Sequence, residues 1–235
     1  MSASWSAIPT ARCILPTPEP RFAVLVSGSG TNLQALLDSH ARGELGATPA
    51  AVISNRPDAG ALARAERAGA PTRVVDHTAY PDRSAFDADL GDALAEIDPD
   101  WIVLAGFMRI LTPELIRRFE GRLINIHPSL LPAFRGLDTH RQALEAGCKL
   151  HGTTAHFVTE ELDSGPIIAQ SAVEVADDDT PDSLRQRVQA AEHQLLPQVV
   201  RWLAEGRLTC SGQRVHFGGR AAPLGAITAP PLADP

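Results

Sequence analysis

An amide and an imidazole stand two residues apart near the middle of the sequence, at Asn125 and His127. Three of the four residues 123–126 are aliphatic, which predicts a strand over 122–127, so both side chains would project from the same face. Pro128 should end this strand at its carboxyl end, where open α/β sheets bind ligands. Asn can donate a hydrogen bond to a developing oxyanion, and His can move a proton near neutral pH. The pair predicts a catalytic site, with a core Asn and His satisfied by backbone groups as an equally good alternative.

A carboxylate near His127 would stabilise the charged imidazole and raise its pKa. Asp163 is a candidate, in the acidic loop 159–165, although most such acids only solvate a turn. The sequence alone does not bring Asp163 to His127. His140, His151 and His156 have no metal-ligand spacing and are expected to be structural or surface histidines.

A glycine-containing turn, residues 27–32, links the apolar run 21–26 to leucines at helical spacing. Strand, turn and helix N-terminus together form an anion site. The dinucleotide fingerprint is incomplete, because Leu33 stands where a third glycine is needed and Asn55-Arg56 where an acid is needed. A P-loop lysine is also missing. The turn therefore predicts a site for one phosphate of a small molecule, or else a tight turn without a ligand.

The segment 106–111 is apolar yet follows a predicted strand. Gly106, Phe107 and Met108 could line a slot for a flat ring, with Arg109 outside it. A β-to-α loop packed on the core is an equally good interpretation.

Strands and helices alternate through the first half, which predicts a doubly wound, mostly parallel α/β sheet. Two later strands with a short link predict an antiparallel extension. The last helix should be interrupted at Pro197 and closed by Gly206. The expected strands are 21–26, 50–53, 72–75, 100–104, 122–127, 149–158 and 166–175, and the expected helices include 58–68, 83–97 and the last one, from about 180 to 204.

The chain has 235 residues, 44% hydrophobic and 21% charged, which predicts one globular domain with tails. We expect a disordered leader over 1–20, a domain over 21–208 and a flexible tail over 209–235. The net charge of −7 argues against a nucleic-acid partner. Three distant cysteines indicate neither disulfides nor zinc, and no apolar run reaches transmembrane length. We therefore expect a cytoplasmic protein without a membrane partner.

Four segments taken together resemble the glycinamide ribonucleotide formyltransferase family. The resemblance covers about residues 21–208 and implies a formyltransferase-like Rossmann variant. It implies 10-formyltetrahydrofolate as co-substrate, small-molecule partners, no metal, and a monomer or homodimer. The segments are Ser27–Gln34, Ala105–Arg109, Asn125–Pro132, and His151-Gly152 through Gly165-Pro166.

The resemblance also implies a mechanism, in which the amine of the ribonucleotide attacks the formyl carbon. Asn125 and His127 would stabilise the oxyanion, His127 would protonate the leaving folate nitrogen, and Asp163 would orient His127 and raise its pKa. Glu192 would hold the ribose. The phosphate would lie on Gly30, Thr31 and Asn32, and the folate on Arg83, Met108, Arg109, Ile110, Leu111 and Asn125. Asp138 stands where many relatives have His, so we leave it out of the catalytic set.

The nearest rival is formyltetrahydrofolate hydrolase, which shares the Asn, His and Asp logic. That family usually has an N-terminal regulatory domain, and it tends to have His-His where this chain has His127-Pro128. Methionyl-tRNA formyltransferase would need an RNA-binding domain and a more basic charge. A non-catalytic binder would not require a proton carrier, and a nucleotide-dependent oxidoreductase is disfavoured by Leu33.

Overall fold

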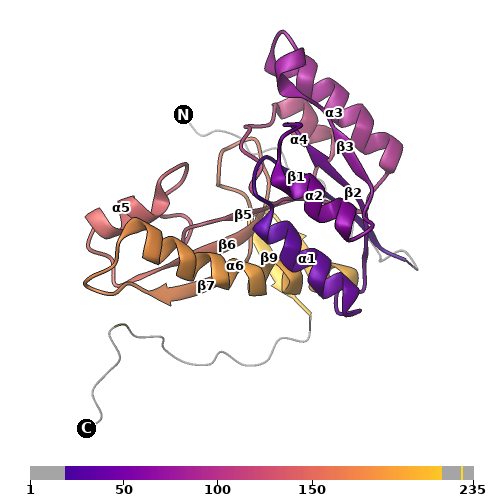
Figure 1. Cartoon of the computed structure of the whole chain (residues 1–235). Helices are drawn as coiled ribbons and strands as arrows, with labels where there is room; N and C mark the ends of the chain where they lie inside the picture. The colour runs from indigo at the N-terminus through magenta and orange to yellow at the C-terminus, as the bar shows by residue number, and fades with distance from the viewer. Residues whose placement is uncertain (1–18, 219–228, 230–235) are drawn as a thin grey trace, which may run out of the picture.

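A single mixed sheet runs through the protein, seen here in a computed structural model that describes residues 19–218 and 229. Its nine strands lie in the order β3-β2-β1-β4-β5-β6-β7-β9-β8. Figure 1 shows how the sheet and its helices are arranged. The first five pair in parallel, and β5–β6, β6–β7 and β8–β9 pair antiparallel. The strands are β1 (Arg21–Val26), β2 (Thr48–Ser54), β3 (Thr72–Val74), β4 (Trp101–Leu104), β5 (Leu123–His127), β6 (Leu150–Phe157), β7 (Ile167–Glu174), β8 (Leu208–Ser211) and β9 (Arg214–Phe217). The predicted doubly wound sheet with an antiparallel extension is confirmed.

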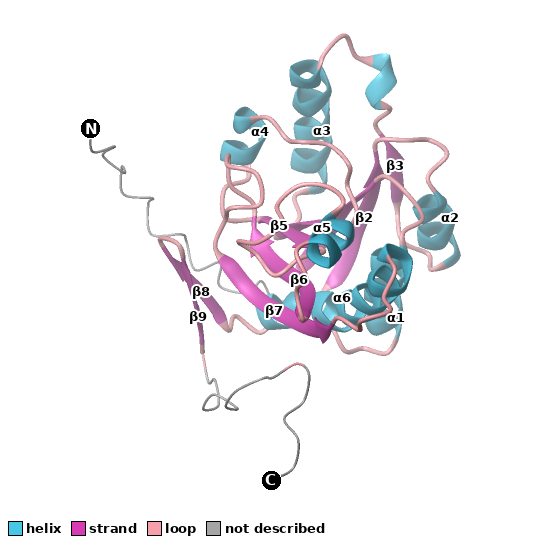
Figure 2. Cartoon of the chain, turned by 90° about the vertical axis from the view of Figure 1, so that its left-hand side faces the viewer, coloured by secondary structure: helices cyan, strands magenta, loops and turns pink. Residues whose placement is uncertain are grey.

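Helices cover both faces of the sheet, with α3 and α4 on one side and α1 and α6 on the other (Figure 2). Alternation along β1 explains the two layers, because Phe22, Val24 and Val26 pack towards α1 and α6 while Ala23 and Leu25 pack towards α3. Both sets are fully buried. The helices are α1 (Thr31–Ala41), α2 (Gly60–Arg67), α3 (Arg83–Ile97), α4 (Pro113–Arg118), α5 (Thr139–Glu145) and α6 (Pro181–Ala204), with a short 3₁₀ turn at His77–Ala79.

Side-chain caps begin three of these helices. Asp82 accepts a hydrogen bond from the backbone of Ala85 at the start of α3, and Thr112 does the same for Leu115 in α4. Thr180 and Ser183 form a reciprocal capping box at the start of α6. The starts expected at Thr112-Pro113 and Thr180-Pro181 are therefore confirmed.

Two expectations about the later part of the chain are wrong. Helix α6 continues through Pro197 rather than breaking there. Apolar side chains on both sides of the proline are buried in the core, and this packing outweighs the lost backbone hydrogen bond.

The expected tail 209–235 is not irregular from its start, because β8 and β9 form a hairpin and β9 pairs with β7. Trp202 packs edge-to-face on Phe217, with ring centroids 4.6 Å apart, and so fixes the hairpin to α6. Helix α5 was not expected at all. The expected leader and most of the remaining tail lie outside the described residues.

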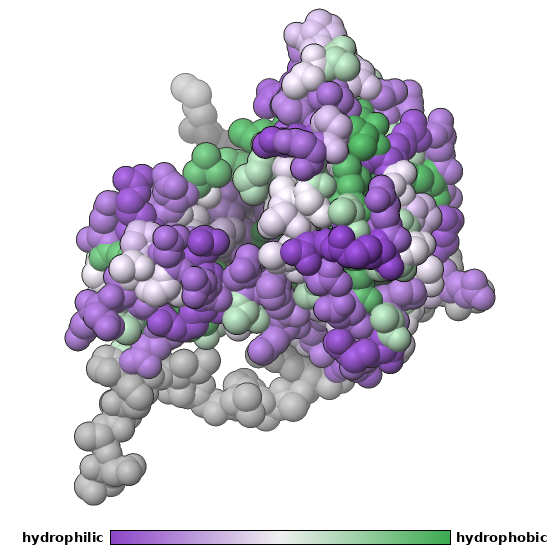
Figure 3. All heavy atoms as spheres, viewed as in Figure 1, coloured by the Kyte–Doolittle hydropathy of each residue, from purple (hydrophilic) through white to green (hydrophobic). Residues whose placement is uncertain are grey.

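The face of the molecule seen in Figure 3 is mostly hydrophilic, with small hydrophobic patches. Among the described helices, none is long and apolar enough to cross a membrane.

Candidate active site

Asn125 lies opposite His156 where β5 pairs with β6, and their side chains meet. His156 Nδ1 is 2.9 Å from the Phe157 carbonyl oxygen and therefore carries the proton, leaving Nε2 to accept from Asn125 Nδ2 at 3.2 Å. Burial lowers the pKa of His156, which is 2% exposed, and keeps the ring neutral. This contact fixes the Asn125 amide and leaves its second N–H available for a ligand.

His127, two residues further along β5, has an oxygen atom close to each of its ring nitrogens. Its Nδ1 lies 3.5 Å from Asp163 Oδ2, and its Nε2 lies 3.0 Å from the Phe134 carbonyl oxygen. Both His127 and Asp163 are buried, at 5% and 9% exposed. The structure therefore brings together the His and the Asp, which are 36 positions apart in the sequence.

The loop 134–138 is fastened to the same carboxylate. The Gly136 N–H donates to Asp163 Oδ2 at 2.9 Å, and Arg135 pairs with Glu161 at 2.7 Å. Asp163 itself has a φ of +48°, a left-handed conformation that is uncommon outside glycine. Asp138, the residue before α5, pairs with Arg141 at 2.8 Å, so its carboxylate is engaged in an ion pair at the start of that helix.

The predicted phosphate residues lie at the amino end of α1. Gly30 precedes the helix with φ +74° and ψ +35°, the left-handed region that glycine allows. Thr31 Oγ1 accepts from Gln189 Nε2 at 3.0 Å, and Asn32 Nδ2 donates to Glu192 Oε2 at 2.9 Å. The predicted phosphate and ribose residues are therefore directly connected.

Glu192 is 7% exposed on α6 and has no cationic partner within the described chain. Burial raises its pKa, and hydrogen bonds from the Asn32 and Thr153 side chains oppose that shift. A buried carboxylate held only by neutral donors is suited to accept hydrogen bonds from hydroxyl groups.

Residues 108–111 follow β4 and divide into exposed and buried positions. Met108 and Ile110 are 69% and 57% exposed, whereas Leu111 is 6% exposed and packs in the core. A contact between Leu111 and a ligand would therefore have to use its backbone. The Arg109 guanidinium lies 4.9 Å from the centroid of the Phe86 ring.

Asp87 links this segment to α3, which begins at Arg83. Its carboxylate accepts the Thr112 backbone N–H. Burial raises the pKa of Asp87, and the Thr112 contacts, then Arg109 and Arg83, oppose the shift. Both arginines predicted to bind the folate therefore interact electrostatically with the buried Asp87 carboxylate.

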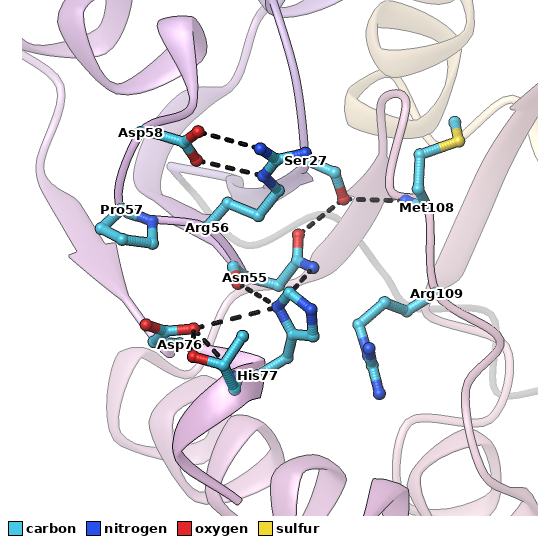
Figure 4. A pocket seen from close by; sticks show the side chains of 10 residues that line it. Ser27, Asn55, Arg56, Pro57, Asp58, Asp76, His77, Met108 and Arg109 are labelled. Atoms are coloured by element: carbon cyan, nitrogen blue, oxygen red, sulfur yellow. Dashed lines mark hydrogen bonds and ion pairs between the residues drawn. The ribbon is translucent and has the colours of Figure 1, made fainter.

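A cavity of about 540 Å³ opens beside Met108 and Arg109 (Figure 4). Ser27 lies in its wall, where Ser27 Oγ accepts the Met108 N–H at 2.8 Å and donates to Asn55 Oδ1 at 2.6 Å. Asn125, His127 and Asp163 are not among its lining residues. The cavity therefore adjoins the predicted folate segment rather than the catalytic cluster.

Within residues 19–218, no group of three His, Cys, Asp or Glu side chains is arranged to hold a metal ion. His151 is 1% exposed, and burial, with a smaller contribution from His140, lowers its pKa to about 4. His140 also has a lowered pKa, mainly because it is buried. Both rings are neutral at pH 7.

Sequence reasoning missed several residues of the site. The sequence predicts a structural or surface role for His156, whereas its register opposite Asn125 brings the two side chains together. Gln189 and Asp87 are absent from the expected set, and Asp87 has no local sequence signal. The spacing of Gln189 and Glu192, one helical turn apart, would have placed both on one face of α6.

Comparisons with known proteins place this geometry in a family. The formyl transferase family model matches residues 20–200. Phosphoribosylglycinamide formyltransferase of Escherichia coli is 46% identical over 202 residues, covering 86% of this chain and 95% of that protein. The crystal structure of glycinamide ribonucleotide transformylase 1 from Symbiobacterium toebii is 50% identical with a TM-score of 0.83, covering 85% of this chain and 94% of that chain.

A formyltetrahydrofolate deformylase from Burkholderia mallei is also similar in structure. Its TM-score is 0.78 and its identity 33%, covering 85% of this chain and 70% of that chain. The two phosphoribosylglycinamide enzymes share clearly more of the sequence. The chain belongs to the formyl transferase family, in which it groups with the phosphoribosylglycinamide formyltransferases rather than with the deformylase.

Proposed function

We propose that the chain transfers the formyl group of 10-formyltetrahydrofolate to the amine of 5'-phosphoribosylglycinamide, a step of purine biosynthesis. The observation that carries this proposal is the approach of His127 Nδ1 to within 3.5 Å of Asp163 Oδ2, on the strand that also carries Asn125. An amide donor, a proton carrier and a carboxylate are the groups that formyl transfer requires.

In the proposed reaction, the amine nitrogen attacks the formyl carbon and the carbonyl oxygen gains negative charge. Asn125 donates its free N–H to this oxygen, and the charged His127 stabilises it as well. Because His156 holds the other Asn125 N–H, the amide is already oriented before charge develops.

The intermediate then collapses as the bond between carbon and the folate nitrogen breaks. The attacking nitrogen loses one proton and the leaving nitrogen gains one, so the transfer is neutral overall. His127 supplies the proton to the leaving nitrogen while Asp163 orients its ring, and the proton lost by the attacking nitrogen returns to His127.

The ribonucleotide would bind between α1 and α6. Its phosphate would receive the backbone N–H groups around Gly30, Thr31 and Asn32, and its ribose hydroxyls would donate to Glu192. The link from Asn32 to Glu192 at 2.9 Å supports this assignment, because it joins the two subsites.

The folate would lie along Met108 to Leu111, with Asn125 near its formyl group. The exposed side chains of Met108 and Ile110 offer apolar surface for a flat ring. Arg83 and Arg109 supply positive charge for the carboxylates of the folate.

We further propose a cytoplasmic enzyme that acts on small molecules without a nucleic-acid or membrane partner, as a monomer or homodimer. Its catalytic domain would span about residues 21–217, which adds the hairpin of β8 and β9 to the domain expected from the sequence.

The alternative is formyltetrahydrofolate hydrolysis, in which water replaces the amine. A formyl-transfer assay with purified protein and both substrates, beside a reaction with water as the only acceptor, separates the two. We expect formylated ribonucleotide and little hydrolysis. Formate release at the same rate with and without the ribonucleotide would contradict the proposal.

A further inference from the structure

Helix α2 contacts the back of the proposed phosphate loop. It lies beside α1 (Figure 1), and its first residues reach the loop directly. The Ala61 N–H donates to the Gly28 carbonyl oxygen at 3.0 Å, and Arg64 Nε donates to the Ser29 carbonyl oxygen at 2.8 Å. Arg64 Nη1 also donates to Gln34 Oε1 at 3.1 Å, which ties the same side chain to α1.

These bonds determine which way the loop's N–H groups point. The C=O and N–H of a planar trans peptide point in opposite directions. Because the Ser29 carbonyl faces Arg64, the N–H of Gly30 faces away from α2. Because the Gly28 carbonyl faces Ala61, the N–H of Ser29 does the same. Both N–H groups are therefore available to an anion on the side opposite α2.

The loop also has no room to rotate towards α2. A Cβ atom added at Gly30 would lie 2.6 Å from Ala61 Cβ, well inside van der Waals contact. The loop and α2 are packed as one unit, so the guanidinium acts on a fixed peptide.

Arg64 brings a full positive charge to this peptide. It forms no ion pair with a carboxylate of the described chain, in contrast to Arg42 and Arg56 on neighbouring segments. A charged donor on a carbonyl polarises the peptide and makes its N–H a stronger donor. The charge of Arg64 can therefore favour an anion that the side chain does not touch.

We propose that Arg64 is a positioning residue of the phosphate subsite, which orients and polarises the Ser29–Gly30 peptide from behind. This inference rests on the proposed function, because it assumes that the phosphate of the substrate occupies the loop.

The test compares three variants of the full chain. Arg64→Gln removes the charge, Arg64→Lys keeps the charge but loses the fork that reaches Ser29 and Gln34 together, and Arg67→Gln is the control. Arg67 is exposed in the last turn of the same helix. Calorimetry gives the Kd for inorganic phosphate and for phosphoribosylglycinamide, and steady-state kinetics gives kcat and each KM.

We expect Arg64→Gln to raise both Kd values about 10-fold, the effect of losing one charged hydrogen bond. Its kcat at saturation and its KM for 10-formyltetrahydrofolate should stay within about twofold of the wild type. In Arg64→Lys both Kd values should rise about threefold, and in Arg67→Gln both should match those of the wild type. If Arg64 had only a structural role, Arg64→Gln would instead lower kcat and weaken the binding of both substrates.

Unchanged Kd values in Arg64→Gln, beside a wild type that binds both ligands, would overturn this inference alone. A wild type that binds neither ligand would overturn the proposed function and this inference with it. Should Arg64→Gln fail to fold, Arg64→Lys decides, and wild-type affinity in that variant would contradict the proposal.

Discussion

The proposed phosphate loop and the proposed catalytic cluster differ in how far apart in the sequence their residues lie. The loop that offers backbone N–H groups to an anion is formed by residues 27–32, between β1 and α1, and only its supports come from α2 and α6. The catalytic cluster instead needs Asn125 and His127 from β5, and Asp163 from the loop after β6. The backbone of Asp163 is in a left-handed conformation, and its carboxylate accepts the Gly136 N–H from the 134–138 loop.

This difference implies that binding and turnover should be separable. A change behind the phosphate loop should weaken ribonucleotide binding and leave the rate of formyl transfer unchanged. A change in the cluster should lower that rate and leave ribonucleotide binding unchanged. The following variants test that separation, from the largest expected effect to the smallest.

His127→Ala should lower kcat about 10³-fold, because it removes the proton donor and one stabiliser of the oxyanion. Its Kd for the ribonucleotide should stay within about twofold of the wild type. Single-turnover rates and calorimetry on the same preparation measure both. Weakened ribonucleotide binding of similar size would show that the two regions are not separable.

Acid should destabilise the protein through His151, which lies behind the cluster. Its folded pKa of about 4 is below the ordinary value of 6.5, so the unfolded chain binds more protons between these two pH values. The contribution of the neutral His151 ring to the free energy of unfolding is complete above pH 6.5. It is lost as the pH falls towards 4, by up to about 3 kcal/mol.

Urea unfolding at several pH values checks this prediction. In His151→Leu, the slope of the unfolding free energy against pH should be smaller than in the wild type by the equivalent of about one proton. His216→Leu, on the exposed hairpin, should keep the slope of the wild type. The same slope in all three proteins would contradict it.

Gly30→Ala should raise the KM for the ribonucleotide at least about 10-fold, with kcat little changed. The added Cβ meets Ala61 at 2.6 Å, and the residue must also keep φ at +74°. Gly43→Ala is the matched control, since Gly43 has φ +71° but open space around it. Equal KM values in the two variants would mean that the contact with α2 does not shape the phosphate site.

Thr180→Ala should lower the free energy of unfolding by about 1 kcal/mol, because it removes the capping box of α6. Helix α6 packs against α1, β6 and β7, and Thr180, at its start, makes none of the proposed contacts to substrate, so this variant should leave kcat and both KM values unchanged at a temperature where it stays folded. A selective loss of ribonucleotide affinity would instead assign the start of α6 to the phosphate region.

The parts of the fold that local patterns encode could be predicted from the sequence. The apolar run of β1, the glycine turn and the leucines of α1 form one continuous signal, and Thr112 and Thr180 mark helix starts by their caps. These interactions join residues a few positions apart, which local propensity describes well.

The rest depends on contacts across long stretches of chain. The position of His156 beside Asn125 follows from the pairing of β5 with β6, and the hairpin of β8 and β9 from packing on α6. Pro197 stays inside its helix because tertiary packing overrides propensity. Residue type alone makes Asp163 a candidate partner for His127, but only the resemblance to a family brings the two together.

A double-mutant cycle on His127 and Asp163 tests most directly whether the carboxylate acts through the ring. We predict that Asp163→Asn lowers the single-turnover rate of formyl transfer about 10²-fold in the wild type and less than about twofold when His127 is already alanine. Losses that multiply in the double variant would contradict this account, because Asp163 would then contribute to the reaction independently of His127.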